Sequence, residues 1–181
     1  MPGRQAHSAR YTIGLGRMSA PADRLIMPDT PATLPVAWDH PDPFILPLAP
    51  LPEDIDGLNH VNNAVYVHWC ERAGWAHSAN LGLTLADYRR LNRAMAIRRG
   101  EYDYRLPARL GDALELGTWI TATDGKLAME RRFQLVRPRD GATLLYGRWD
   151  VVCIELSSGR PTRMPPEFCA VYHGAVVRSQ T

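Results

Sequence analysis

Acidic, amide and imidazole side chains crowd into one stretch of this sequence, Asp54-Ile55-Asp56-Gly57-Leu58-Asn59-His60-Val61-Asn62-Asn63-Ala64-Val65-Tyr66. From Asn63 to about Leu81, apolar residues recur at three- and four-residue spacing without a proline, which predicts a helix. Asn59 and Asn62 are candidate N-caps, and Gly82 is a candidate left-handed stop. The first turn of a helix has unpaired N–H groups and partial positive charge, so this helix start can hold an oxyanion or a polarised carbonyl.

The chain before this stretch lacks persistent helical or strand periodicity. Residues 1–43 are rich in proline, alanine and small polar residues, which predicts a mobile or loosely docked arm. Phe44 to Leu51 is apolar and extended in character, but Pro47 and Pro50 each lack an amide donor. We therefore expect an irregular strand or an edge strand there.

Short alternating segments follow Asn92 and predict an antiparallel sheet. Asp-Gly pairs at residues 124–125 and 140–141 suit the positive φ angles of tight hairpin turns. Four segments are therefore expected to form a meander in sequence order: residues 101–106, 114–120, 127–135 and 144–156. A short terminal helix is expected from Pro165 to about Val171, with proline at its start.

The composition fits one globular domain and excludes several functional classes. The 181 residues are 45% hydrophobic and 22% charged, and the formal net charge of +2 gives no support for nucleic-acid binding. Three widely spaced cysteines without a CxxC pair argue against a disulfide framework and fit a reducing compartment. No apolar run approaches the roughly 20 residues that span a bilayer, and no secretory signal is evident, so we expect a cytoplasmic protein without a membrane partner.

One helix followed by antiparallel strands, with an acid-rich turn before the helix, resembles the hotdog-fold thioesterases of the 4-hydroxybenzoyl-CoA thioesterase type. The resemblance covers roughly residues 44–170 and depends on Asp54-Ile55-Asp56, His60-Val61-Asn62-Asn63, Tyr66 and the segment Tyr104–Asp112. It implies an α+β hotdog fold over residues 44–175, in which a curled antiparallel sheet wraps around one long central helix. It also implies an acyl-CoA or acyl-carrier-protein substrate, no cofactor, and a homodimer or homotetramer with sites at the subunit interface.

The resemblance also assigns roles to individual residues. Asp56 falls on the catalytic carboxylate, as general base or as nucleophile, and Asn63 presents its backbone N–H to the thioester carbonyl. His60 matches a histidine that orients the acid or a water, or donates to the carbonyl. The other predicted substrate-binding residues are Asn62, Tyr66 and Trp69.

Each of these roles has a structural alternative. Asp56 can simply hold a turn or cap the helix, and His60 can be a hydrogen-bonded structural residue. Asn62 and Asn63 also suit caps, and Trp69 suits a hydrophobic core. Five arginines can meet the phosphates of CoA or form a solvated sheet face: Arg98, Arg99, Arg131, Arg132 and Arg137.

Further candidates for chemistry lie on the predicted helix. Glu71 occupies a helix where some hotdog enzymes place their acid, but we expect it to form an ion pair. His68, Cys70 and His77 are spaced too widely to converge on a metal, so no metal site is predicted. The sequence therefore favours an acyl-CoA thioesterase, with a non-hydrolytic acyl-thioester-binding module, an acyl-carrier-protein thioesterase or a hydratase as alternatives.

Overall fold

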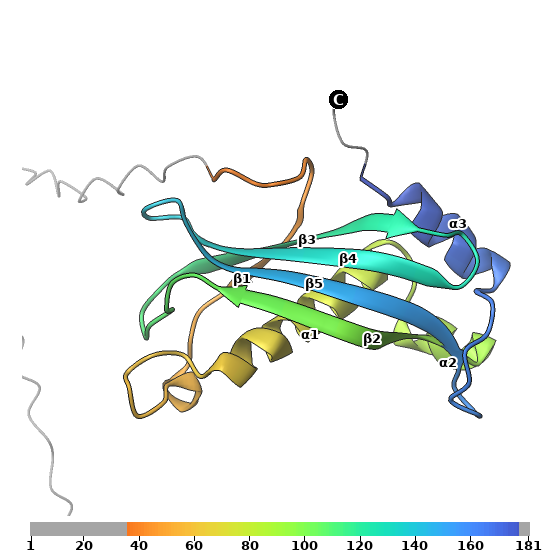
Figure 1. The fold of residues 1–181 in the computed structure, drawn as a ribbon, viewed down its shortest axis with the longest axis horizontal. Coiled ribbons are helices and arrows are strands. Elements are labelled where there is room, and N and C mark those ends of the chain that lie inside the picture. The colour runs from red at the N-terminus through yellow and green to blue at the C-terminus, as the bar shows by residue number, and fades with distance from the viewer. Residues whose placement is uncertain (1–35, 178–181) are drawn as a thin grey trace, which may run out of the picture. The chain divides into compact units, whose positions relative to one another are not determined.

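The structure is a computed structural model that describes residues 36–177. Five strands form one antiparallel sheet in the order β1-β3-β4-β5-β2. The strands are β1 (Phe44–Leu48), β2 (Arg93–Tyr104), β3 (Leu114–Thr123), β4 (Ala128–Arg137) and β5 (Ala142–Glu155). The helices are α1 (Asn63–Asn80), α2 (Leu85–Leu91) and α3 (Pro166–Gly174), with a 3-10 turn η1 at Pro52–Asp54 (Figure 1). No helix within these described residues is long and apolar enough to cross a membrane.

The predicted long helix is confirmed as α1. Its N-cap is Asn62, whose side-chain oxygen accepts a hydrogen bond of 2.9 Å from the Ala64 N–H. Asn59, the other candidate, lies in the preceding turn with a φ of 60°. Gly82 takes a φ of 94° just past the helix end, a conformation that glycine adopts without steric cost. The predicted stop is therefore confirmed as well.

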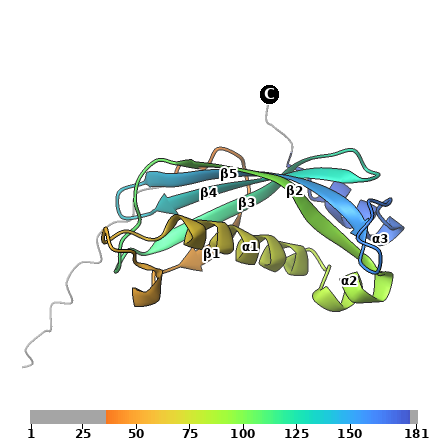
Figure 2. The ribbon, with the colours of Figure 1, turned by 60° about the horizontal axis from the view of Figure 1, so that its bottom comes forward.

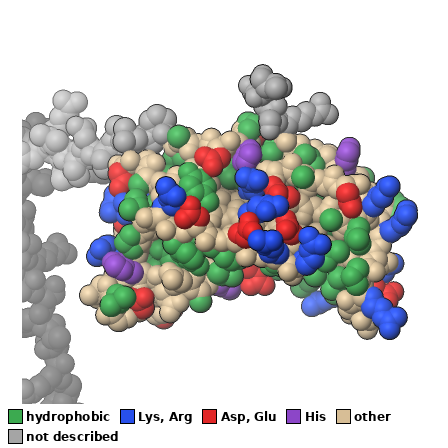
Figure 3. Space-filling view, viewed as in Figure 1, with side chains coloured by type: hydrophobic (Ala, Val, Ile, Leu, Met, Phe, Trp, Pro, Cys, Tyr) green, Lys and Arg blue, Asp and Glu red, His purple; other side chains and the backbone are tan. Residues whose placement is uncertain are grey.

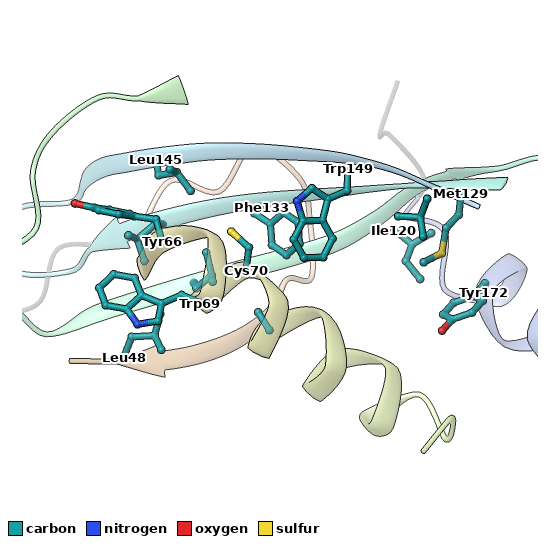
Figure 4. Close-up of a cluster of buried hydrophobic side chains, with 14 of the residues drawn as sticks. Leu48, Tyr66, Trp69, Cys70, Ile120, Met129, Phe133, Leu145, Trp149 and Tyr172 are labelled. Carbon is teal, nitrogen blue, oxygen red and sulfur yellow. The ribbon is translucent and has the colours of Figure 1, made fainter. Parts of the chain in front are cut away.

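Helix α1 packs its buried side against one face of the sheet, and Figure 2 shows it beneath the strands. Trp69 and Cys70 of the helix meet a core that contains Phe133 and Trp149 of the sheet (Figure 4). A Cβ at Gly74 would lie only 3.3 Å from the Trp149 ring, so a residue without a side chain lets sheet and helix approach closely.

The sheet departs from the predicted meander in one strand. β3, β4 and β5 do pair in sequence order, with positive φ at Gly125 and Gly141 in the turns between them. The first segment was expected beside β3, and this is wrong, because β2 pairs with β5 at the opposite side of the sheet. The connection over residues 105–113 lacks a tight hairpin turn and carries the chain past the start of α1 to β3.

Other elements are partly as expected. β1 is an edge strand, as the prolines predicted, and Pro47 stands opposite Glu115 of β3. The terminal helix is confirmed as α3. Helix α2 was not predicted, although Thr84 and Asp87 form a capping box at its start, with the Thr84 N–H donating to Asp87 Oδ2 over 3.0 Å.

Residues 36–43 lie against the face of the sheet opposite α1. The Asp39 N–H donates to Gln134 Oε1 over 2.9 Å, and Trp119 Nε1 donates to the Pro41 carbonyl over 2.9 Å. A Cβ at Gly117 would lie 2.6 Å from the Trp38 ring, so glycine is needed where this segment crosses β3. Most of the predicted arm lies outside the described residues, and a domain boundary at residue 43 stays a prediction.

Charged side chains of both signs gather in the middle of this outer face (Figure 3). Glu130 accepts hydrogen bonds from Arg132 Nε over 2.8 Å and from Arg148 Nε over 2.6 Å. Partial burial alone would raise the pKa of Glu130, but the bonds from Thr121 and the two arginines outweigh it and hold that pKa at about 2. Two of the arginines considered as CoA contacts therefore form ion pairs within the sheet region. Arg132 pairs with Glu130, and Arg137 pairs with Asp112 and Asp140.

Candidate functional site

Asp56 closes the turn that leads into α1. Its Oδ1 accepts hydrogen bonds from the backbone N–H groups of Leu58 and His60, over 2.8 and 3.4 Å. The Asp56 N–H in turn donates to the His60 carbonyl over 2.8 Å. Within the described chain, Oδ2 accepts no hydrogen bond. One carboxylate oxygen therefore fixes the turn, and the other is left for a ligand or a water.

The first N–H group of α1 belongs to Asn63. The Ala64 N–H is taken by the Asn62 side chain, and the Val65 N–H donates to the Asn62 carbonyl over 2.9 Å. The Asn63 N–H donates to no acceptor among residues 36–177. It lies at the positive end of an 18-residue helix, where a partial negative charge on a ligand is stabilised.

The connection between β2 and β3 covers this helix start. Tyr104 Oη donates to the Asn63 carbonyl over 3.1 Å, the Ala108 N–H donates to Tyr66 Oη over 2.8 Å, and the Val61 N–H donates to the Ala108 carbonyl over 3.0 Å. These bonds hold two segments that lie about forty residues apart in the sequence. They fix the position of the connection over the turn that contains Asp56.

A groove of about 290 Å3 lies between the turn and this connection. It brings together four residues singled out from the sequence, Asp56, His60, Asn63 and Tyr66. We call it the Asp56 groove. Its other walls come from residues that had no predicted role in the site: Leu58, Val61, Tyr104, Arg105, Leu106 and Pro107.

The two tyrosines of the groove stay protonated at neutral pH. Burial raises the pKa of Tyr66, although the hydrogen bond from Ala108 partly opposes this shift. Burial also raises the pKa of Tyr104. The two rings meet edge to face with centroids 5.4 Å apart. These phenols therefore act as hydrogen-bonding and packing groups and not as acids.

Two of the predicted substrate-binding residues do not line the groove. Asn62 is exposed and its side chain caps the helix. Trp69 is only 3% exposed and packs against Tyr66, with ring centroids 5.3 Å apart. Asn62 thus fixes the helix start, and Trp69 supports a tyrosine of the groove wall. Glu71, the alternative acid, lies outside the groove with its Oε2 at 3.8 Å from His68 Nδ1.

Sequence reasoning missed the wall formed by Tyr104, Arg105, Leu106 and Pro107. These residues lie in the segment Tyr104–Asp112 that supported the resemblance, so a signal was present. The sequence did not indicate that this segment folds over the helix start.

No group of three or more His, Cys, Asp or Glu side chains in the described part of the chain is placed to hold a metal ion.

The family model of the thioesterase-like superfamily matches residues 50–171 of this chain. The chain belongs to the thioesterase-like superfamily. The matched range contains the Asp56 groove, helix α1 and four of the five strands. Membership is thus established for the part of the molecule that forms the site.

Two curated relatives and one solved structure extend this result. Protein THEM6 from Danio rerio is 37% identical over 81 residues, which is 44% of this chain and 40% of that protein. Acyl-CoA thioesterase YbgC from Haemophilus influenzae is 28% identical over 134 residues, covering 72% of this chain and 94% of that protein. The protein SAV2348 from Staphylococcus aureus, solved in complex with CoA, superposes with a TM-score of 0.69 at 19% identity, covering 77% and 89% of the two chains. The predicted hotdog fold is confirmed.

Proposed function

We propose that this protein is an acyl-CoA thioesterase, which hydrolyses an acyl thioester to a carboxylic acid and free CoA. The observation that carries the proposal is the shared groove of Asp56 and Asn63: a half-buried carboxylate with one free oxygen and a helix-start residue with a free N–H. A thioester is already activated, so its hydrolysis needs only a nucleophile or base and a donor for the oxyanion.

In this mechanism, the thioester carbonyl oxygen accepts from the Asn63 N–H, and Asp56 Oδ2 either takes a proton from the attacking water or attacks the carbonyl itself. Either route consumes one water and releases CoA as the thiol. Negative charge develops on the carbonyl oxygen as the tetrahedral intermediate forms. A positioned N–H donor typically lowers this barrier by about 3 kcal/mol. His60 lines the same groove and is proposed to orient the water or the carbonyl.

The relatives support the choice of CoA as carrier. YbgC is named an acyl-CoA thioesterase, and SAV2348 was solved with CoA bound. Arg105 lies on the wall of the Asp56 groove and pairs with the exposed Asp103, with its Nη1 at 3.0 Å from Asp103 Oδ2. Because this surface ion pair is exposed to solvent, we propose that Arg105 also contacts a CoA phosphate. An acyl-carrier-protein substrate is the competing proposal, and a cytoplasmic location remains a prediction from the sequence.

We further propose that two copies pair through β2, as a homodimer or as half of a homotetramer. β2 is a sheet-edge strand of 12 residues, and its outer side pairs with no other strand in the described chain. Ile97 and Tyr104 of this strand are 48% and 41% exposed, which is unusual for large apolar residues on a long edge. Light scattering that finds a strict monomer would contradict this proposal.

The experiment is a panel of acyl-CoA esters, from acetyl to palmitoyl and benzoyl, with released thiol titrated over time. We expect saturable thiol release from at least one ester. A non-hydrolytic binding module would instead bind CoA esters saturably and release no thiol from any of them. The acyl-carrier-protein alternative predicts turnover only when the same acyl group is presented on the carrier protein.

A further inference from the structure

A buried arginine without an acidic partner lies under the second half of α1. Arg131 of β4 is only 2% exposed. Its Nη1 lies 2.9 Å from His77 Nδ1 and 3.4 Å from Thr118 Oγ1, and its Nη2 lies 3.4 Å from Ser78 Oγ. No Asp or Glu of the described chain forms an ion pair with it. Arginine keeps its charge in proteins, so a full positive charge is held among uncharged groups.

The partners of Arg131 supply no compensating charge. Burial and the nearby Arg131 charge together lower the pKa of His77 to about 4, so the imidazole is neutral and its Nδ1 accepts. Ser78 Oγ lies 3.2 Å from Tyr172 Oη, which also hydrogen-bonds to Tyr88 Oη. Burial raises the pKa of Tyr172, so this phenol is neutral as well. A buried charge that lacks an opposite charge is costly, and an anionic ligand would relieve that cost.

The guanidinium lines a small pocket between α1 and the sheet. The pocket has a volume of about 160 Å3, and its other buried residues with a polar side-chain atom are Ser78 and Tyr88. Glu71 also lines the pocket, but its side chain is exposed. Its walls are mainly apolar and aromatic, including Trp75, Met95, Met129 and Trp149. Figure 4 shows Trp149 and Met129 projecting from the sheet on the side of α1. We call this cavity the Arg131 pocket. It is smaller than the roughly 300 Å3 or more typical of drug-sized ligands, so it suits a short chain.

We propose that the Arg131 pocket binds a carboxylate carried on a short apolar chain, with the anion against the Arg131 guanidinium and the chain among the aromatic and methionine side chains. Two sources present this chemistry. One is a free short-chain carboxylic acid, and the other is the far end of a carboxyl-terminated acyl thioester. The second source rests on the proposed thioesterase function, whereas the first does not.

The test is the binding of sodium hexanoate and of hexanol, which share a chain length and differ in charge. Trp75 and Trp149 line the pocket, so tryptophan fluorescence reports occupancy, with calorimetry as a second measurement. We expect hexanoate to bind saturably and at least about tenfold more tightly than hexanol. Equal binding of the two compounds, or no binding of hexanoate, would overturn the proposal.

Variants locate the binding. Arg131→Met should bind hexanoate and hexanol equally, whereas Arg89→Met, which removes an exposed arginine of α2, should bind as the wild type does. Met95→Trp fills the pocket, leaves Arg131 in place and should abolish binding of both compounds, which keeps the test decisive if Arg131→Met does not fold. Undiminished hexanoate binding by Met95→Trp would contradict the assignment.

Asn63 and Ser78 are separated by about 22 Å along α1, at 1.5 Å per residue, so only a long acyl chain can join the two sites. Hexadecanedioyl-CoA and palmitoyl-CoA, both with sixteen-carbon acyl groups, therefore separate the two sources. If the acyl tail reaches Arg131, hexadecanedioyl-CoA has the lower KM by at least about tenfold, and Arg131→Met removes that difference. If both esters behave alike while hexanoate still binds, the free acid is the ligand. Asp56→Asn should leave hexanoate binding unchanged, so a failure of the thioesterase proposal is distinguishable from a failure of this one.

Discussion

At its N-terminal end, α1 borders a polar groove, whereas beneath its second half it covers a mainly apolar pocket with one buried cation. In the Asp56 groove, the half-buried charged group is an acid whose one oxygen is already fixed by local backbone N–H groups, and the cation Arg105 is exposed on the wall. In the Arg131 pocket, the charged group is a buried base that has only uncharged partners. The same helix therefore borders two cavities whose less exposed charged groups have opposite signs.

The difference lies in how each site is assembled. The chemistry of the groove comes mainly from residues 56–66, a continuous turn and helix start. The pocket joins Ser78 of α1 to Arg131 of β4 and to Met95 of β2, residues that the sheet topology brings together from distant parts of the chain. The Asp56 turn of the groove is fixed by short-range hydrogen bonds, whereas the geometry of the Arg131 pocket depends on the register of the strands that form it.

Among the predictions in this comparison, the largest effect on activity is expected from loss of the N–H donor at the helix start. Asn63→Pro removes the N–H group together with the asparagine side chain. The helix start should persist, because proline is well tolerated at the first helical position and Asn62 already has an extended ψ of 137°. We expect kcat to fall about 100-fold, the effect of losing one oxyanion donor.

The matched control is Asn63→Ala, which keeps the N–H and removes the side chain. Its kcat should stay within about threefold of the wild-type value, because the proposed donor is the backbone group. Equal rates for the alanine and proline variants would exclude the Asn63 N–H as the oxyanion donor. Circular dichroism and thermal unfolding of both variants would establish that the helix start is intact.

Burial of His77 beside Arg131 should make the stability of the protein depend on pH. The pKa of His77 is about 4 in the folded protein and ordinarily 6.5, so the unfolded chain binds a proton that the folded chain excludes between these values. The stability is therefore complete above about pH 6.5 and falls as the pH drops toward 4. The contribution of His77 to this loss is about 3 kcal/mol.

Replacing His77 with glutamine tests this assignment, because the amide oxygen can still accept from Arg131 and does not titrate. Urea unfolding at pH 7, 6, 5 and 4 should give a shallower loss of stability for His77→Gln than for the wild type. Parallel profiles for the two proteins would show that His77 is not the group responsible. Glu130, whose pKa is also lowered, contributes equally to both profiles.

The smallest effect is expected at the two asparagines before α1. Asn62→Ala removes the helix cap and should lower the free energy of unfolding by about 1 kcal/mol. Asn59→Gly should cost less or stabilise, since Asn59 already has a positive φ of 60° that glycine adopts freely. Urea denaturation measures both, and a larger loss at Asn59 would reverse the assignment of the cap.

Local signals in the sequence were enough for much of the fold. Helix α1, its Asn62 cap, the two Asp-Gly turns and the edge position of β1 each depend on residues within a few positions of one another. The position of β2 was not predictable in this way. It depends on the connection over residues 105–113, whose hydrogen bonds to Val61 and Tyr66 form only once α1 is in place.

In the site too, features set by neighbouring residues in the sequence were predictable, whereas features set by tertiary packing were not. Asp56, His60 and Asn63 were found because they are neighbours in the sequence, and the groove contains all three. Trp69 was expected to contact substrate, but its position behind Tyr66 follows from helix packing. Arg131 was grouped with exposed arginines, because nothing in its own segment indicates that it faces α1 and is buried.

The central claim is that the Asp56 carboxylate drives thioester hydrolysis, and thiol release by Asp56→Asn and Asp54→Asn tests it most directly. Asparagine at position 56 keeps an oxygen for the Leu58 N–H and removes only the charge, and Asp54 does not line the groove. With the best acyl-CoA of the panel at saturation, Asp56→Asn should lose at least about 100-fold in kcat and Asp54→Asn should remain within about threefold of the wild type. A wild-type rate for Asp56→Asn would contradict the claim.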